Sequence, residues 1–133
     1  MVKMGERIRI KRIFEPPLPE DGFRVLVDRL WPRGLPKESA RIDLWLKEIA
    51  PGHDLRKWFG HDPEKWEEFQ RRYFRELDQR PEAVEQLLQK TREGTMTLLY
   101  AARDPEFNNA RALKTYLEKK LNESETNAGR ASR

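Results

Sequence analysis

Two apolar segments stand out along the chain because each of them ends abruptly in charged residues. Residues 23–30 and residues 96–102 are apolar on both faces, which is typical of strands inside a parallel sheet. Residues 7–11 instead alternate polar and apolar side chains, as a strand with one solvated face does. We therefore predict that the first two segments form the centre of a sheet and that residues 7–11 lie toward its edge.

The stretch between the two central strands has a helical pattern and is long enough for a right-handed crossover between parallel strands. Apolar side chains at helical spacing predict buried helix faces at residues 42–49, 55–59, 66–77 and 83–88. Helix boundaries are predicted by four signals, namely starts at Asp62 and Pro81 and ends at Gly60 and Gly94.

The C-terminal part of the chain predicts one more helix. Asp104 followed by Pro105 is a second start signal, and an apolar stripe then continues to about Asn122. Residues 122–133 contain no large apolar side chain, so we expect a disordered tail there. The chain is thus predicted to form one α/β domain over residues 1–121, with a small, largely parallel sheet flanked by helices. The orientation of the first strand is left open.

Composition narrows the classes of function. At 133 residues the chain has the length of one domain that can bury a core without disulfides or a structural metal. It contains no cysteine, which excludes thiolate catalysis, and only two histidines, His53 and His61, which argues against a histidine-rich metal site. We find no signal-peptide pattern and no apolar run of the roughly 20 residues that a membrane span needs. We therefore expect a soluble, cytoplasmic protein without a membrane partner.

The charge of the chain is nearly balanced. Charged residues make up 38% of it, but 27 basic and 23 acidic side chains leave a net charge of only +4. The basic excess is concentrated near the N-terminus, in Lys3, Arg7, Arg9, Lys11 and Arg12. A solvated strand face explains this pattern more simply than a nucleic-acid interface does, and we keep the nucleic-acid-interacting module as the alternative function.

Charged and aromatic side chains follow both central strands at the point where each strand ends. Because the carboxyl ends of parallel strands meet at one edge of a sheet, we expect these side chains to lie close together. They are Asp28, Arg29, Trp31 and Arg33 after the first strand and Arg103 and Asp104 after the second. Guanidinium groups and a helix N-terminus both attract anions. The sequence therefore predicts a pocket for a phosphate- or carboxylate-bearing small molecule.

Other side chains could complete this pocket. Asn108 and Asn109 lie near the predicted start of the last helix and offer side-chain amides. If the protein is an enzyme, the candidate catalytic residues are Asp28, His61 and Asp104, with His61 suited to acid–base chemistry near neutral pH. Asp28 and Asp104 are too few ligands for a metal site to be predicted, and a cofactor is left unknown.

Two other interpretations of the same residues remain open. Asp28 could pair with Arg33 or Arg103 while Asp104 caps a helix, in which case the charges would only stabilise the fold. A protein-interaction domain is the other possibility, which an exposed apolar patch on the helices would indicate. The chain contains no glycine-rich phosphate loop, nucleophile elbow or zinc-protease motif, so the sequence assigns no reaction.

Several motifs together closely resemble the YeaO-like family, a branch of the DUF488 family of domains of unknown function. They are I-R-I-K-R at 8–12, E-P-P at 15–17, V-L-V-D-R-L-W-P-R-G at 25–34, D-L-W-L-K-E-I-A-P at 43–51, W-F-G-H-D-P at 58–63 and L-L-Y-A-A-R-D at 98–104. The resemblance covers about residues 7–121 and implies a compact α/β domain without an established activity.

The resemblance also implies which polar positions characterise the family. They are Asp28, Arg29, Trp31, Arg33, Trp58, His61, Asp62, Arg103, Asp104 and Asn109 in this chain. We predict Trp58 as a ligand-binding residue on this ground. More distant members place a cysteine near the end of the second central strand, where this chain has Tyr100, Ala101 and Ala102. A thiol mechanism would therefore not transfer to this protein.

Overall fold

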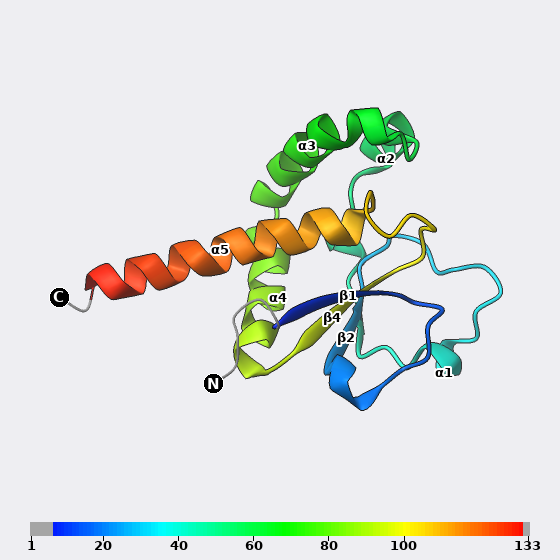
Figure 1. Cartoon of the computed structure of the whole chain (residues 1–133), viewed down its shortest axis with the longest axis horizontal. Coiled ribbons are helices and arrows are strands. Elements are labelled where there is room, and N and C mark those ends of the chain that lie inside the picture. The colour runs from blue at the N-terminus through cyan, green and yellow to red at the C-terminus, as the bar shows by residue number, and fades with distance from the viewer. Residues whose placement is uncertain (1–6, 132–133) are drawn as a thin grey trace.

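A four-stranded sheet, in which every pair of neighbouring strands is parallel, forms the centre of the protein (Figure 1). The computed structural model describes residues 7–131, with the side chains of residues 7–124. The strands are β1 (Ile8–Arg12), β2 (Phe23–Leu26), β3 (Leu44–Trp45) and β4 (Met96–Tyr100), in the order β1-β4-β2-β3. The predicted centre, the edge position of the first strand and the parallel pairing are confirmed, and β1 runs parallel to β4.

The helices lie mainly on one side of the sheet. They are α1 (Lys37–Ala40), α2 (His53–Phe59), α3 (Trp66–Asp78), α4 (Pro81–Glu93) and α5 (Asn109–Ala131). Figure 1 shows α5 running along the sheet and projecting beyond it, with α2 and α3 above the carboxyl ends of the strands. The predicted ends at Gly60 and Gly94 and the predicted starts at Asp62 and Pro81 are confirmed, since Asp62 caps a short 3₁₀ helix that leads into α3.

Consecutive residues of the central strands feed two separate hydrophobic clusters. Val25 and Leu98 belong to the larger cluster under α2, α3, α4 and α5, whereas Leu26 and Leu99 face the opposite side. This alternation follows from the two-residue repeat of a strand. The second side is covered by the segment between β2 and β3, from which Trp31 packs onto the smaller cluster. The central strands are thus buried on both faces, although only one face carries long helices.

One predicted helix is wrong, because residues 42–49 form β3 and a 3₁₀ helix at Lys47–Ile49 instead. The Asp43 amide donates to the Arg24 carbonyl and the Leu46 amide donates to the Leu26 carbonyl, so this segment extends the sheet beside β2. A short apolar run is compatible with a helix or a strand by periodicity alone. Here the free edge of β2 supplies backbone partners, and the strand forms.

Both central strands are shorter than predicted, since β2 ends at Leu26 and β4 ends at Tyr100. Side chains replace the strand ladder at these ends. The Val27 carbonyl accepts a hydrogen bond from Asn109 Nδ2, and the Ala101 amide donates to the Asp28 carboxylate. The backbone groups are satisfied without a continuing strand, so the chain can diverge there.

The last helix differs from the prediction at both ends. α5 begins at Asn109, and its cap is Asn108, whose Oδ1 accepts from the Arg111 amide at 2.8 Å. Asp104 instead closes a turn by accepting from the amides of Glu106 and Phe107. α5 runs on to Ala131, so residues 122–131 of the expected tail are helical, while 132–133 lie outside the described residues. No proline interrupts this stretch, so its sequence permits the helix to continue.

A buried carboxylate, Asp21, holds the connection between β1 and β2 in place. It lies in a 3₁₀ helix at Pro19–Asp21 and is only 1% exposed. Its side chain accepts from Lys11 Nζ at 3.0 Å, from Arg24 Nη1 and from the Leu18 amide at 3.0 Å. Arg24 also donates to the carbonyls of Ala40 and Arg41. This network joins β1, β2 and the end of α1.

The partners of Asp21 determine its protonation. Burial alone would raise the pKa of this carboxyl, but the hydrogen bonds from Leu18, Lys11 and Arg24 outweigh it and lower the pKa below its ordinary value of 3.8. Asp21 is therefore ionised in the folded protein and stabilises it through two cations.

We expect Asp21→Asn to lower the free energy of unfolding by about 3 kcal/mol, because it leaves the buried Arg24 without its carboxylate. Urea unfolding at neutral pH measures this change. Glu20→Gln is the matched control, since Glu20 is an exposed neighbour on the same 3₁₀ helix. Equal stability of the two variants would contradict the structural role of Asp21.

The stabilisation by Asp21 should also depend on pH. Because the folded pKa lies below the ordinary 3.8, the contribution is complete above that value and is lost as the pH falls through the folded pKa. We expect the stability difference between the wild type and Asp21→Asn to be constant near neutral pH and to shrink below about pH 4. Urea unfolding at several pH values tests this, and a constant difference down to pH 3 would refute it.

Candidate functional site

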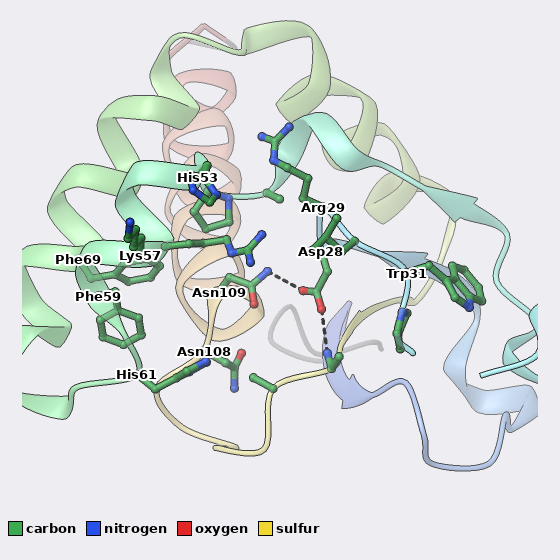
Figure 2. Close-up of a pocket in the computed structure, with 17 residues that line it drawn as sticks. Asp28, Arg29, Trp31, His53, Lys57, Phe59, His61, Phe69, Asn108 and Asn109 are labelled. Carbon is green, nitrogen blue, oxygen red and sulfur yellow. Dashed lines mark hydrogen bonds between the residues drawn. The ribbon is translucent and has the colours of Figure 1, made fainter. Parts of the chain in front are cut away.

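A pocket of about 470 Å³ opens at the carboxyl ends of β2 and β4 (Figure 2). Its lining comes from the segments after β2 and β4, from α2 and the turns that flank it, from the start of α5 and from one residue of α3. The volume falls within the range of roughly 300–1,000 Å³ that is usual for small-molecule sites. Parallel pairing of β2 with β4 brings these distant segments together, as the sequence predicted.

Asp28 lies in the middle of this pocket, between the ends of the two central strands. Its Oδ2 accepts from the Ala101 amide at 2.9 Å, and its Oδ1 accepts from Asn109 Nδ2 at 2.9 Å (Figure 2). The backbone is held as well, because Trp45 Nε1 donates to the Asp28 carbonyl at 2.8 Å. The carboxylate is thus fixed by α5 and by the residue that follows β4, while β3 fixes the backbone of Asp28.

The Asp28 carboxyl differs from Asp21 in having no cation bound to it. Burial raises its pKa above the ordinary value of 3.8, and the hydrogen bonds from Asn109 and Ala101 and the charge of Arg56 offset this only in part. Among the described residues it forms no ion pair, so the alternative in which Asp28 pairs with Arg33 or Arg103 is wrong. A raised pKa in a pocket is a feature of functional carboxylates.

One face of α2 supplies basic side chains to the pocket. His53, Arg56 and Lys57 stand at positions i, i+3 and i+4, which lie on the same side of a helix. Figure 2 shows His53 and Lys57 on the α2 side of the pocket, away from Asp28. None of these three residues was among the site residues predicted from the sequence. Their helical spacing just before the Gly60 stop was the signal that could have found them.

The segment after β2 adds a further cation. Arg29 lines the pocket, and its Nε atom is buried without a hydrogen-bond partner in the part of the chain that the structure describes. A buried donor of this kind is uncommon, because buried polar groups are nearly always bonded to protein or water. Arg29, Arg56 and Lys57 also form no ion pairs within residues 7–124.

His61 lies at the rim of the pocket in a constrained backbone conformation. Its φ of 58° follows the φ of 52° at Gly60, so two consecutive residues are left-handed after the end of α2. This region is unfavourable for a residue with a side chain and is enriched at functional sites. The turn places His61 beside Phe59, with ring centroids 6.1 Å apart.

Aromatic rings form the apolar part of the lining. Phe59 of α2 and Phe69 of α3 stack with centroids 4.3 Å apart, and both rings are almost fully buried. They give the pocket a rigid wall between its charged groups and the core.

The predicted site residues divide into two groups. The structure brings Asp28, Arg29, Trp31, His61, Asn108 and Asn109 to the pocket lining. Two of them also have clear structural roles. Asn108 caps α5, and Trp31 packs edge-on against Trp45 and donates its indole N–H to the Leu35 carbonyl.

The remaining predicted residues do not line the pocket. Arg33 and Arg103 are exposed, and Asp104 closes the turn before α5. Trp58 is flanked by Lys65 at 5.1 Å and Arg72 at 4.2 Å from its ring centroid, which places it on the outer side of α2 and α3. A role for Arg33, Trp58 and Arg103 in ligand binding and a role for Asp104 in catalysis stay predictions.

The basic N-terminal strand has internal partners. Arg9 donates to the Glu20 carbonyl, Lys11 binds Asp21, and Arg12 donates to the carbonyls of Ala101 and Ala102. These bonds give the cations of β1 a structural role, whereas Lys3 lies outside the described residues.

Two further kinds of feature, a metal-ligand cluster and a membrane-spanning helix, are absent from the described residues. Within them, no three acidic or histidine side chains gather closely enough to hold a metal ion. None of the helices there is both long and apolar enough to cross a lipid bilayer.

The fold and the pocket define a parallel-sheet α/β domain with a cation-lined pocket at the carboxyl ends of its central strands. The chain belongs to the DUF488-N3i family, described as the inactive DUF488-N3 subclade, whose profile matches residues 7–133. It is similar to the uncharacterized protein YeaO of Escherichia coli, with 38% identity over 110 residues, which cover 83% of this chain and 96% of YeaO.

A second group of relatives is mycobacterial. An uncharacterized protein of Mycobacterium tuberculosis is 48% identical over 71 residues, which cover 53% of this chain. The match spans 60% of the length of that relative. No solved structure matches the chain. The predicted family resemblance is therefore confirmed, and the relatives carry no named activity.

We expect Asp28→Asn to lower the free energy of unfolding by at most about 1 kcal/mol at pH 7, the value of one hydrogen bond to Asn109. Because the folded pKa of Asp28 is raised, its ionised form destabilises the protein above that pKa, and the substitution removes this penalty. The cost of the substitution should therefore grow as the pH falls toward 4. Urea unfolding at pH 7 and pH 4 tests this, and a loss at pH 7 as large as that of Asp21→Asn would contradict it.

Proposed function

We propose that the protein binds a small molecule bearing a phosphate or carboxylate group in the pocket beside Asp28. The observation that carries this proposal is a set of three cations in one concave site, Arg29, Arg56 and Lys57, that form no ion pair with the described residues. Several arginine and lysine side chains elsewhere bind nearby carboxylates, as in the pair of Arg72 with Glu68.

Electrostatics supports an anion as the missing partner. Like charges held together in a concave site repel one another and concentrate positive potential there. An anion would relieve this repulsion, and guanidinium groups bind phosphate and carboxylate through two parallel hydrogen bonds. Arg29 Nε, which is buried without a partner among the described residues, would gain an acceptor at the same time.

Binding is favoured over turnover by two features. The family is described as inactive, and the end of β4 presents the methyl groups of Ala101 and Ala102 to the pocket rather than a nucleophile. Should a reaction occur, Asp28 and His61 are the lining groups that could transfer a proton, whereas Asp104 lies outside the lining.

The proposal predicts that inorganic phosphate, citrate or phosphorylated metabolites raise the thermal unfolding temperature and bind with an affinity that falls with salt. For any ligand found, we expect Arg56→Ala to weaken binding at least about 10-fold, because a hydrogen bond to a charged group is worth roughly 1.5–3 kcal/mol. Isothermal titration calorimetry measures both effects.

Arg103→Ala is the matched control, since Arg103 is exposed and does not line the pocket. Its affinity should stay within about twofold of the wild type, a change below about 0.5 kcal/mol. An absence of binding by any acidic or phosphorylated compound would refute the proposal. A larger loss of affinity with Arg103→Ala than with Arg56→Ala would indicate that the ligand binds beside Arg103, among the arginines that the sequence first suggested.

A further inference from the structure

The pocket has two ends with opposite hydrogen-bonding chemistry. On the α2 side, Arg56 and Lys57 carry only donors, as does Arg29 after β2. On the other side, Asp28 and Asn109 lie together at the ends of the central strands (Figure 2). The two ends would contact different parts of one ligand.

The Asp28–Asn109 end presents acceptors only. Asn109 Nδ2 donates to the Val27 carbonyl at 3.1 Å and to Asp28 Oδ1 at 2.9 Å, which uses both hydrogens of the amide. The oxygen of this amide therefore remains as an acceptor. Each Asp28 oxygen accepts one hydrogen bond, Oδ1 from Asn109 and Oδ2 from Ala101, and can accept another.

Asn108 lines the same pocket, but its side-chain amide is bonded to the backbone near the start of α5. Its Nδ2 donates to the Asp104 carbonyl, and its Oδ1 accepts from the Arg111 amide. It is 1% exposed, so its side chain serves the start of α5. The polar surface beside Asp28 is thus set by the carboxylate and the Asn109 oxygen.

We infer that the ligand carries a hydrogen-bond-donating nitrogen, such as an ammonium or an amino group, at the end opposite its phosphate or carboxylate. This inference rests on the proposed function and specifies the class of ligand. A ligand with anionic groups throughout would meet the Asp28 carboxylate, which has no bound cation to neutralise it. A donor nitrogen would instead occupy the acceptors that Asp28 and Asn109 leave open.

The middle of the pocket constrains the ligand as well. Phe59 and Phe69 form a stacked wall in the same lining. The raised pKa of Asp28 is caused by burial, which the hydrogen bonds from Asn109 and Ala101 and the charge of Arg56 offset only in part. Two sources share the inferred chemistry, namely zwitterionic amino acids and nucleotides whose base bears an amino group.

Matched pairs of compounds test the inference in the wild-type protein. AMP is compared with ribose 5-phosphate, which keeps the phosphate and lacks the base, and glutamate is compared with glutarate, which keeps both carboxylates and lacks the ammonium. We expect at least one donor-bearing compound to bind about 10-fold more tightly than its partner, by calorimetry at low salt. The pair that discriminates identifies the source of the donor.

Asp28→Asn then tests whether the discrimination depends on the carboxylate. We expect the preference to fall below about threefold in this variant. Asp54→Asn is the control, because it makes the same change of charge on an exposed residue of α2 that does not line the pocket. That control should keep the wild-type preference.

The failures of the two proposals are distinguishable. If ribose 5-phosphate and glutarate bind as tightly as their partners, the inference is overturned while anion binding stands. If the preference survives in Asp28→Asn, the inference is also overturned. If none of the four compounds binds and inorganic phosphate does not bind either, the proposed function itself fails. The wild-type comparison needs no variant to fold, so it decides the inference by itself.

Discussion

The hydrogen bond from the Ala101 amide to the Asp28 carboxylate is the contact on which the pocket depends. It forms because β2 and β4 run in parallel, with Leu26 opposite Leu99, so that the two chains leave the sheet at the same edge. The carboxylate ends the ladder by satisfying an amide that a longer strand would have bonded. Asn109 completes the arrangement from α5 by bonding both Val27 and Asp28. The hydrogen bonds that replace the strand ladder at the ends of β2 and β4 are therefore also the ones that hold Asp28 in the pocket.

Two carboxylates, the buried Asp21 and the partly buried Asp28, show how the same side chain can stabilise the fold or form part of a site. Asp21 lies between Lys11 and Arg24, and its partners lower its pKa. Asp28 receives only neutral donors, and burial raises its pKa. The first arrangement stabilises the folded state at neutral pH, whereas the second destabilises it. A protein has no structural reason to keep a costly carboxylate where an amide would serve, and such positions are typical of functional sites.

The parts of the fold that could be predicted are those in which local pattern and tertiary context agree. The central strands are apolar on both faces, and α3 and α4 have strong start signals at Asp62 and Pro81, so sequence alone identified them. β3 was missed because its apolar spacing also fits a helix, and only the free edge of β2 decides between the two. The early ends of β2 and β4 were missed because their backbone partners are side chains from other segments.

The site residues could likewise be predicted only where the sequence pattern determines their position in the fold. Parallel strands place Asp28 and Asn109 together, which the sequence anticipated, but the cations come from a helix whose position depends on how α2 packs. Arg33 and Arg103 come after the central strands and do not line the pocket, whereas Arg56 and Lys57 of α2 are exposed and line it. Arg56 lies close enough to lower the pKa of Asp28 without forming an ion pair with it. Asp28 and the cations of α2 line the same pocket without forming an ion pair, which leaves space for a ligand between them. A ligand with a donor group at one end and an anionic group at the other would bind both Asp28 and the cations.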